Sequence, residues 1–549
     1  MTDFSFHFQQ TLCKIGTLSD SGPTTILIRP DGETIDSFGF DAEARYAELA
    51  EDREHKEWYF FKRFKMQLFD KIGLSGSFTI VDASGKPLQA KTVFSLSIRY
   101  LKDDLMDMSE RQLMDQHLEE KDIHWVLTVP AIWNDVAKQF MREAAENAGL
   151  KAENVTIALE PESASLYCQH IPATKSHNSL GKLPAGSIYL ILDAGGGTVD
   201  VTAHQVMSDG ILKEIHQATG GDWGGTKVDQ AFEKFICEIT GEGVMDSFKN
   251  KAMEDYLDLM RCFEVKKREI KASSDRQITL KMPVALIDET EDLTGITIRE
   301  NVQYSTYRDQ IKLAGDKIRL DPDIMKGFFT ESLESIVNHL EDLFRLPQLQ
   351  ECQTILMVGG YSESSILQER IKACFREKNV IIPADAGLAV LKGAVIFGHN
   401  PSLIAERICR FTYGTTATHI KESSCAHRET TTFIAEGKER CDDIFSVHVR
   451  AGDVVKVGDW QEERSYLPVY PTQTSILFGI YCTKNRSPEL VTDSGCVKLG
   501  EVELPMPDTT GGVNRKVFAS FRFGGTELEV KVIDKSAGTE RKISLSFLG

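Results

Sequence analysis

The chain has 549 residues, of which 41% are hydrophobic and 26% charged, and its formal net charge is −19. This length exceeds what a single hydrophobic core supports, so roughly two to four domains are expected. The excess of 82 acidic over 63 basic residues argues against a general nucleic-acid binder and against a protein that binds anionic membranes.

The eleven cysteines are scattered singly, without a CxxC pair. This spacing indicates reduced thiols, because a disulfide framework or a zinc site needs closer, patterned cysteines. The start of the chain, MTDFSFHFQQ, lacks the charged and apolar regions of a signal peptide, and no apolar run is long enough to span a bilayer. We therefore expect an intracellular protein without a membrane span, in the cytoplasm, with the nucleus as an alternative.

Up to about residue 400, predicted strands alternate with predicted helices. HWVLTVP (124–130) has the composition of a buried strand, and Asn134 can cap a following helix that ends at Gly149. NVTIALEPESASLYCQ (154–169) repeats the order of strand and helix, with a Glu-Pro corner between them. Such alternation predicts an α/β architecture with sites at the carboxyl ends of the strands.

The next elements continue this alternation. Two strands at 186–206 pair around a run of glycines, and 354–375 is a strand, a Gly-Gly turn and a helix. A helix is predicted at 224–240, because its apolar residues advance by threes and fours. These residues are Val228, Ala231, Phe232, Phe235, Ile236 and Ile239.

After residue 400 strands replace helices. Residues 518–547 alternate with period two and are broken at two turns, a pattern typical of a β meander or sandwich. We therefore predict three units, at 1–185, 186–400 and 401–549, and each has the size of an ordinary domain.

The stretch ILDAGGGTVDV (191–201) places three consecutive glycines, 195–197, between Asp193 and Asp200. A plain hairpin turn is one interpretation, but three glycines exceed what a tight turn needs, and each costs chain entropy. Without Cβ atoms, successive amides can hold phosphate oxygens, and Thr198 adds a hydroxyl donor. Because the two carboxylates would repel phosphate, a Mg²⁺ ion with its waters is implied.

Two further clusters point to the same ligand class. GGYSES (359–364) follows a strand and opens a helix, where a nucleotide can lie against the backbone. In RCFEVKKREIKAS (261–273), Glu264, Lys267 and Arg268 share one helical face. Taken alone, this last run is more typical of a solvated charged face than of a ligand site.

Five motifs resemble the heat-shock 70 kDa protein family of the actin, sugar-kinase and heat-shock ATPase superfamily, in order and spacing. They are LILDAGGGTVDVTAH, ALEPESASLY, GGDWGGTKVDQAFEKFI, CFEVKKREIKAS and ILMVGGYSES. Further stretches, such as FFKRFKMQLF and FRFGGTELEVKV, are similar to the divergent branch called heat shock 70 kDa protein 12A-like. The resemblance covers nearly the whole chain.

This resemblance implies a two-lobed actin-like (ribonuclease H-like) ATPase fold followed by a β-rich module. Lobe I would be 1–185, lobe II would be 186–400 including a closing return helix, and 401–549 would bind polypeptide clients or signalling partners. ATP or ADP would lie between the lobes with Mg²⁺, and the expected function is that of an ATP-binding, chaperone-like protein of the stress response.

The resemblance also implies four catalytic residues in this chain. Asp193 would hold Mg²⁺ through water, and Asp200 would act as a proton acceptor. Glu160 would be the second carboxylate around the metal-bound water. Lys65 is the predicted lysine beside the γ-phosphate, with Lys62 as the alternative.

The resemblance also implies three groups of nucleotide contacts. The phosphate group is Gly195, Gly196, Gly197 and Thr198. The group beside the ribose and phosphates is Gly224 and Gly225. The group around the adenosine is Glu264, Lys267, Arg268, Lys271, Gly359, Gly360, Tyr361 and Asp385.

The chain also departs from the family pattern. The first phosphate hairpin, which normally ends in Asp-x-Gly-Thr-Thr, is missing, and FSFHF (4–8) alternates like its second strand. Either an upstream segment has been cut off or half of the phosphate cradle has been lost, so hydrolysis is expected to be weak. Lys271 replaces a small polar residue, and Glu363 replaces an arginine that stacks on the base. No acidic-hydrophobic linker follows Phe397, and neither a helical lid nor an acidic tail follows the last strands.

Three hypotheses follow. The first is an ATP-binding, chaperone-like protein, and the second is a catalytically dead scaffold that keeps nucleotide as a structural ligand. The third is a small-molecule kinase of the same superfamily. The helical CFEVKKREIKAS motif and the lack of a recognisable sugar pocket favour the first over the third.

Overall fold

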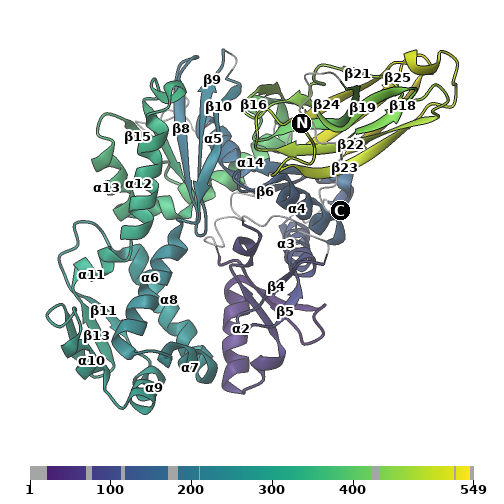
Figure 1. Ribbon diagram of the computed structural model, residues 1–549. Helices are drawn as coiled ribbons and strands as arrows, with labels where there is room; N and C mark the ends of the chain where they lie inside the picture. Colours follow the sequence, from purple (N-terminus) through teal and green to yellow (C-terminus); the bar gives the residue numbers. More distant parts are fainter. Residues whose placement is uncertain are drawn as a thin grey trace.

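The structure is a computed structural model, and it describes residues 22–69, 77–112, 118–170, 183–208, 210–421, 432–524 and 527–544. Two lobes of helices and sheets precede a region made of strands (Figure 1). This arrangement confirms the predicted α/β fold and the β-rich C-terminal region. The strand predicted at 4–8 lies outside the described residues.

Lobe I contains a three-stranded antiparallel sheet, β2-β1-β3, and a parallel pair, β6-β7. As predicted, Asn134 caps a helix: its side chain accepts a hydrogen bond from the Ala137 amide at 2.9 Å, and Gly149 follows the helix with φ +95°. The elements are β1 (Thr25–Ile28), β2 (Ile35–Phe38), α2 (Gly39–Glu51), β3 (Tyr59–Lys62), β4 (Thr79–Val81), β5 (Pro87–Gln89), α3 (Ala90–Gln112), β6 (Trp125–Val129), α4 (Asp135–Asn147), β7 (Val155–Leu159) and α5 (Glu160–His170).

Lobe II is built on a large mixed sheet and a small antiparallel sheet, β11-β13-β12. The predicted apolar face of α6 is buried in its core, with Ala231 half-buried at the margin. The elements are β8 (Ile188–Ala194), β9 (Val199–Val206), β10 (Leu212–Gly221), α6 (Gly225–Thr240), α7 (Val244–Lys251), α8 (Met253–Glu269), β11 (Ile278–Lys281), α9 (Val284–Thr294), α10 (Ile298–Tyr304), β12 (Ile311–Ala314), β13 (Lys317–Leu320), α11 (Pro322–Gly327), α12 (Thr330–Phe344), β14 (Thr354–Val358), α13 (Ser365–Cys374), β15 (Asn379–Ile381) and α14 (Ala389–His399).

The large sheet takes two strands from beyond residue 400, in the order β15-β14-β8-β9-β10-β16-β20. β16 (Ile404–Ile408) runs parallel to β10, and β20 (Val454–Lys456) pairs with β16. Arg407 of β16 also makes a buried ion pair with Glu162 of lobe I, at 2.5 Å. The domain boundary predicted at residue 400 therefore falls just before a strand that is hydrogen-bonded into lobe II.

The C-terminal region is a pair of sheets, β18-β19-β17-β22-β23 and β21-β24-β25-β26, around one apolar cluster. Its green to yellow strands lie beside the β16 end of the large sheet in Figure 1. Within the described ranges, no helix combines the length and the apolar character needed to cross a membrane. The strands are β17 (Thr412–Ile420), β18 (Thr432–Ala435), β19 (Lys438–Val449), β21 (Arg464–Tyr466), β22 (Ser475–Thr483), β23 (Val497–Pro505), β24 (Val517–Gly524), β25 (Glu527–Asp534) and β26 (Thr539–Ser544).

The two lobes touch through helices and through an apolar cluster. Helix α5 of lobe I crosses α14 so closely that a Cβ at Gly393 would lie 1.6 Å from the carbonyl oxygen of Ser163. Helix α2 of lobe I packs on α8 of lobe II. This second contact between the lobes is called the outer seam. The buried residues of the outer seam are Leu27, Ala42, Tyr46, Leu49, Phe60 and Leu257.

Candidate functional site

The turn between β8 and β9 is the stretch predicted to bind phosphate. Asp193 and Asp200 are direct partners across these antiparallel strands, so their carboxylates lie close together, and both residues are buried. Glu160, the first residue of α5, contacts Lys65 in the short helix η2 (Phe64–Leu68). The structure therefore brings the four predicted catalytic residues to one place, and their roles stay a prediction.

Burial is the main cause of the altered acidity of this cluster. It raises the pKa of Asp193 well above its ordinary value, and the negative charges of Glu160 and Asp200 raise it further. Burial and Glu160 raise the pKa of Asp200 to about 7, although the Ile132 amide, which donates to Asp200 at 2.8 Å, opposes the shift. Lys65 lowers both pKa values but does not cancel the effect of burial. Such a cluster favours the binding of a cation.

The structure separates the two candidate lysines. Lys62 ends β3 and its ammonium pairs with Glu43 of α2 at 3.4 Å. Arg63 then adopts a left-handed conformation, with φ 51°, which turns the chain before η2 and Lys65. Lys65, rather than Lys62, lies beside the buried carboxylates.

The glycine turn is fixed by the start of α6. The amides of Gly224, Gly225 and Thr226 donate to the carbonyl oxygens of Gly197, Gly195 and Gly196 at 3.1, 3.2 and 2.7 Å. A Cβ at Gly224 would lie 2.6 Å from the Gly195 oxygen, so only glycine fits this close approach. The glycines predicted at the ribose therefore touch those predicted at the phosphates.

These bonds also orient the amides of the turn. In a trans peptide the carbonyl oxygen and the next N–H point in opposite directions. Since the carbonyls of 195–197 point toward α6, the N–H groups of Gly196, Gly197 and Thr198 point away from it. Three successive amides on one side of a turn form a concavity suited to an anion.

The second glycine pair lies next to the same acids. β14 is parallel to β8, with Val358 opposite Asp193, and Gly359 follows with φ +85°. A Cβ at Gly359 would lie 2.5 Å from both the Ala194 carbonyl oxygen and Asp193 Oδ1. Tyr361 is different: its ring is buried in the lobe II core, and Ser332 donates to its hydroxyl at 3.2 Å. Its backbone is therefore the part that a nucleotide could contact.

The remaining predicted base-side residues are more exposed. Asp385 pairs with Lys392 of α14 at 2.5 Å and accepts a hydrogen bond from the Tyr167 hydroxyl at 3.3 Å. Glu363 accepts one from the Gly387 amide at 3.3 Å. Lys271 is exposed just after α8. Nothing in the sequence motif around Asp385 indicated Lys392, whose charge offsets that of Asp385.

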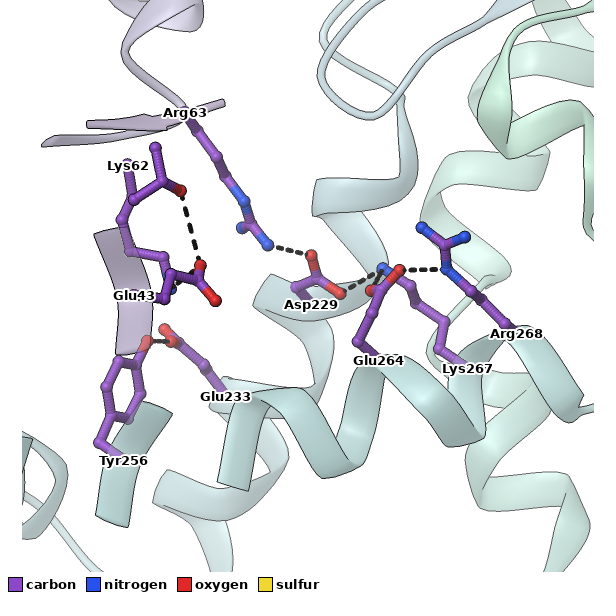
Figure 2. A network of polar contacts seen from close by, with 10 residues as sticks. Glu43, Lys62, Arg63, Asp229, Glu233, Tyr256, Glu264, Lys267 and Arg268 are labelled. Carbon is purple, nitrogen blue, oxygen red and sulfur yellow. Dashed lines mark hydrogen bonds and ion pairs between the residues drawn. The ribbon is translucent and has the colours of Figure 1, made fainter. Parts of the chain in front are cut away.

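The predicted adenosine clamp lies on one face of α8, as its spacing indicated (Figure 2). Lys267 contacts Glu264, and Arg268 donates to Glu264 at 2.7 Å. Burial alone would raise the pKa of Glu264, but Lys267 and Arg268 more than offset it, so the pKa lies below its ordinary value. Sequence reasoning missed two members of this network, Asp229 of α6 and Arg63 of lobe I, which pair with each other.

Arg410, just before β17, connects the C-terminal region to the site. Arg410 donates from Nη1 to the carbonyl oxygens of Ala131 and Trp133, at 3.1 and 3.0 Å. Between them lies Ile132, whose amide binds Asp200. A displacement of Arg410 would therefore act on Asp200 through a single residue of lobe I.

A metal ion would be held here through water. In the described part of the chain, no group of three or more His, Cys, Asp or Glu side chains is placed to hold an ion directly. The carboxylates of Glu160, Asp193 and Asp200 nevertheless supply the oxygen donors that Mg²⁺ prefers, and Mg²⁺ keeps several of its waters when bound. The residues present therefore fit a hydrated ion that also contacts phosphate.

The comparisons with known proteins agree with this arrangement. The family model described as Hsp70 protein matches residues 79–402. Heat shock 70 kDa protein 12A of Mus musculus is 32% identical over 588 residues, covering 97% of this chain and 86% of the relative. Heat shock 70 kDa protein 12B of Homo sapiens is 31% identical over 594 residues, again covering 97% of this chain and 86% of the relative. The chain therefore belongs to the Hsp70 family, and its two lobes form an Hsp70-type, actin-like ATPase domain.

Proposed function

We propose that the chain binds ATP and ADP with Mg²⁺ between its two lobes. The observation that carries this proposal is the β8–β9 turn, where three amides face one side and two buried carboxylates, Asp193 and Asp200, lie at the base. Grouped amides suit phosphate oxygens, and buried carboxylates suit a hydrated divalent cation. Membership of the Hsp70 family supports the same ligands.

The residues of the turn have distinct roles in this proposal. Mg²⁺, when bound, offsets negative charge on the phosphates. Asp193 would hold water of the ion, and Lys65 would pair with the γ-phosphate. Asp200 would accept the proton of the water that attacks the γ-phosphorus, as the bond to the leaving ADP breaks. Lys65 must leave its contact with Glu160 before it can pair with phosphate.

Lys65 should distinguish ATP from ADP in a thermal denaturation experiment. A ligand that binds only the folded state stabilises it, so saturating Mg-ATP should raise the melting temperature by about 3 °C or more. Mg-ADP should raise it less, since it lacks the phosphate that Lys65 contacts. In Lys65→Met the two nucleotides should give equal shifts.

The matched control is Lys91→Met, which removes a lysine that pairs with Glu143 elsewhere in lobe I. This variant should keep the difference between ATP and ADP. The absence of any shift in the wild type at millimolar nucleotide, with or without Mg²⁺, would count against the proposed function.

We also propose that the C-terminal region contacts polypeptide partners and responds to nucleotide. Ile420, Ile434 and Leu477 are 44%, 76% and 56% exposed on its strands, and exposed apolar side chains suit a polypeptide. Through Arg410, Mg-ATP should change amide hydrogen exchange in β17. Arg410→Met should abolish that change, whereas Arg450→Met, which alters contacts to Arg486 and Ser487, should retain it. An unchanged exchange rate in wild-type β17 would contradict the coupling.

A further inference from the structure

A row of alternating charges links lobe I to the predicted adenosine clamp (Figure 2). Arg63 of lobe I contacts Asp229 Oδ2 at 2.5 Å, and Lys267 of lobe II contacts Asp229 Oδ1 at 2.6 Å. Lys267 also contacts Glu264, which binds Arg268. Each carboxylate therefore lies between two cations, and within this row Asp229 is the carboxylate that contacts lobe I.

Burial makes Asp229 the critical member of this row. Its side chain is 5% exposed and that of Lys267 is 11% exposed, whereas Arg63 is 47% exposed. A buried charge is tolerated only when it is paired, and loss of the Asp229 charge would leave the Lys267 ammonium with one carboxylate partner, Glu264, in place of two. Loss of Arg63 has a smaller effect, because the pair between Asp229 and Lys267 remains.

The position of Asp229 on α6 connects this row to the glycine turn. Asp229 is four residues after Gly225, so it lies one helical turn from the amides that bind the carbonyls of the β8–β9 turn. In addition, Arg261 of α8 pairs with Glu43 of α2 at 3.4 Å, close to the outer seam. Lobe contacts thus lie along α8, beside the clamp residues.

We propose that Asp229 is a positioning residue of the nucleotide site. It fixes the ammonium of Lys267 at the nucleoside end and, through Arg63, makes that position depend on closure of the two lobes. The part that concerns Lys267 rests on the proposed function, whereas the part that concerns closure does not require nucleotide.

Two variants distinguish the positioning of Lys267 from the closure of the lobes. Asp229→Asn keeps the shape of the side chain but removes both ion pairs, so Lys267 keeps only its contact with Glu264 and one contact between the lobes is lost. Arg63→Gln removes the same contact between the lobes but leaves Lys267 bound to Asp229. Glu289→Gln is the matched control, because Glu289 is a buried carboxylate of lobe II that binds Lys251 and Ser247.

Closure is tested by hydrogen exchange mass spectrometry on the full chain without nucleotide. Asp229→Asn and Arg63→Gln should both exchange faster in α2 and η2, since these segments lie at the lobe contact. Glu289→Gln should exchange faster in α7 and α9 instead. Wild-type rates in α2 and η2 for both Asp229→Asn and Arg63→Gln would overturn the proposal, and if Asp229→Asn does not fold, Arg63→Gln alone decides this part.

The positioning of Lys267 is tested by titration with a fluorescent ADP analogue and Mg²⁺. Asp229→Asn should bind about tenfold more weakly than the wild type, which corresponds to the loss of one favourable charged contact. Arg63→Gln should lose affinity only about threefold, and Glu289→Gln should bind like the wild type. Equal losses in Asp229→Asn and Arg63→Gln would overturn the role in positioning, because closure alone would then explain both. Failure of the wild type to bind the analogue would overturn the proposed function, while the exchange rates would still decide closure.

Discussion

Replacing Gly196 with valine should abolish nucleotide binding while the ligand-free protein melts within about 1 °C of the wild type. A Cβ at Gly196 would meet no protein atom within 4 Å, and its φ lies outside the left-handed region, so the fold tolerates a side chain there. Because α6 fills the carbonyl side of the turn, we expect this side chain to lie on the open side, to which the amides of Gly196, Gly197 and Thr198 point. The valine would therefore block phosphate without disturbing the protein.

Gly224→Ala, in contrast to Gly196→Val, should destabilise the protein even without nucleotide. Its new methyl group would lie within 2.7 Å of the Gly195 and Gly196 carbonyl oxygens, and would force α6 away from the turn. We expect this variant to lose several degrees of melting temperature even without ligand, because overpacking typically costs about 1–3 kcal/mol. The melting temperatures of Gly196→Val and Gly224→Ala, measured with and without Mg-ATP, test both predictions. A normal nucleotide response in Gly196→Val would contradict the predicted phosphate site.

The second large effect concerns the pH dependence of stability at Asp200. Because its native pKa is raised from 3.8 to about 7, the native state keeps a proton that the unfolded state releases near pH 4. Stability therefore falls as the pH rises from about 4 to about 7, and the loss is complete above pH 7. A shift of this size lowers the free energy of unfolding above pH 7 by an amount on the order of 4 kcal/mol. Asp200→Asn removes the ionisable group, so it should be more stable than the wild type at pH 8 and similar to it near pH 4.

Urea denaturation at several pH values, without Mg²⁺ or nucleotide, measures this difference. Glu214→Gln is the matched control, because burial also raises the pKa of Glu214 to about 7, while its carboxylate binds the Ile408 amide rather than the glycine turn. Both variants should gain stability at pH 8, but only Asp200→Asn should lose ATP turnover. If the difference in free energy of unfolding between Asp200→Asn and the wild type does not change with pH, the buried Asp200 carboxyl does not titrate as described.

Much of the fold could be predicted because local patterns agree with tertiary packing. The period of α6, the Asn134 cap and the strands on either side of the glycine run all depend on residues close in sequence. Local patterns do not decide between Lys62 and Lys65, and the preference for Lys65 comes from the resemblance alone. The choice depends on the end of β3 and on the left-handed turn at Arg63, which only the folded chain fixes.

The features that were missed are long-range. Asp229 meets Arg63, which lies 166 residues away in the chain, so no local spacing indicates the pair. The pairing of β16 with β10 also joins distant segments, and only the sheet shows that the strand after residue 400 continues lobe II. Tyr361 lies in a recognised motif, but its ring packs in the core because α6 and α12 supply an apolar environment there.

Isothermal titration calorimetry of the purified chain with ATP measures nucleotide binding at the glycine turn without relying on turnover. With Mg²⁺ present, we expect saturable heat corresponding to one nucleotide per chain, with weaker binding in excess EDTA and no binding in Gly196→Val. An absence of heat for both ATP and ADP up to millimolar concentrations, at two temperatures, would show that the glycine turn and its carboxylates do not hold an adenine nucleotide.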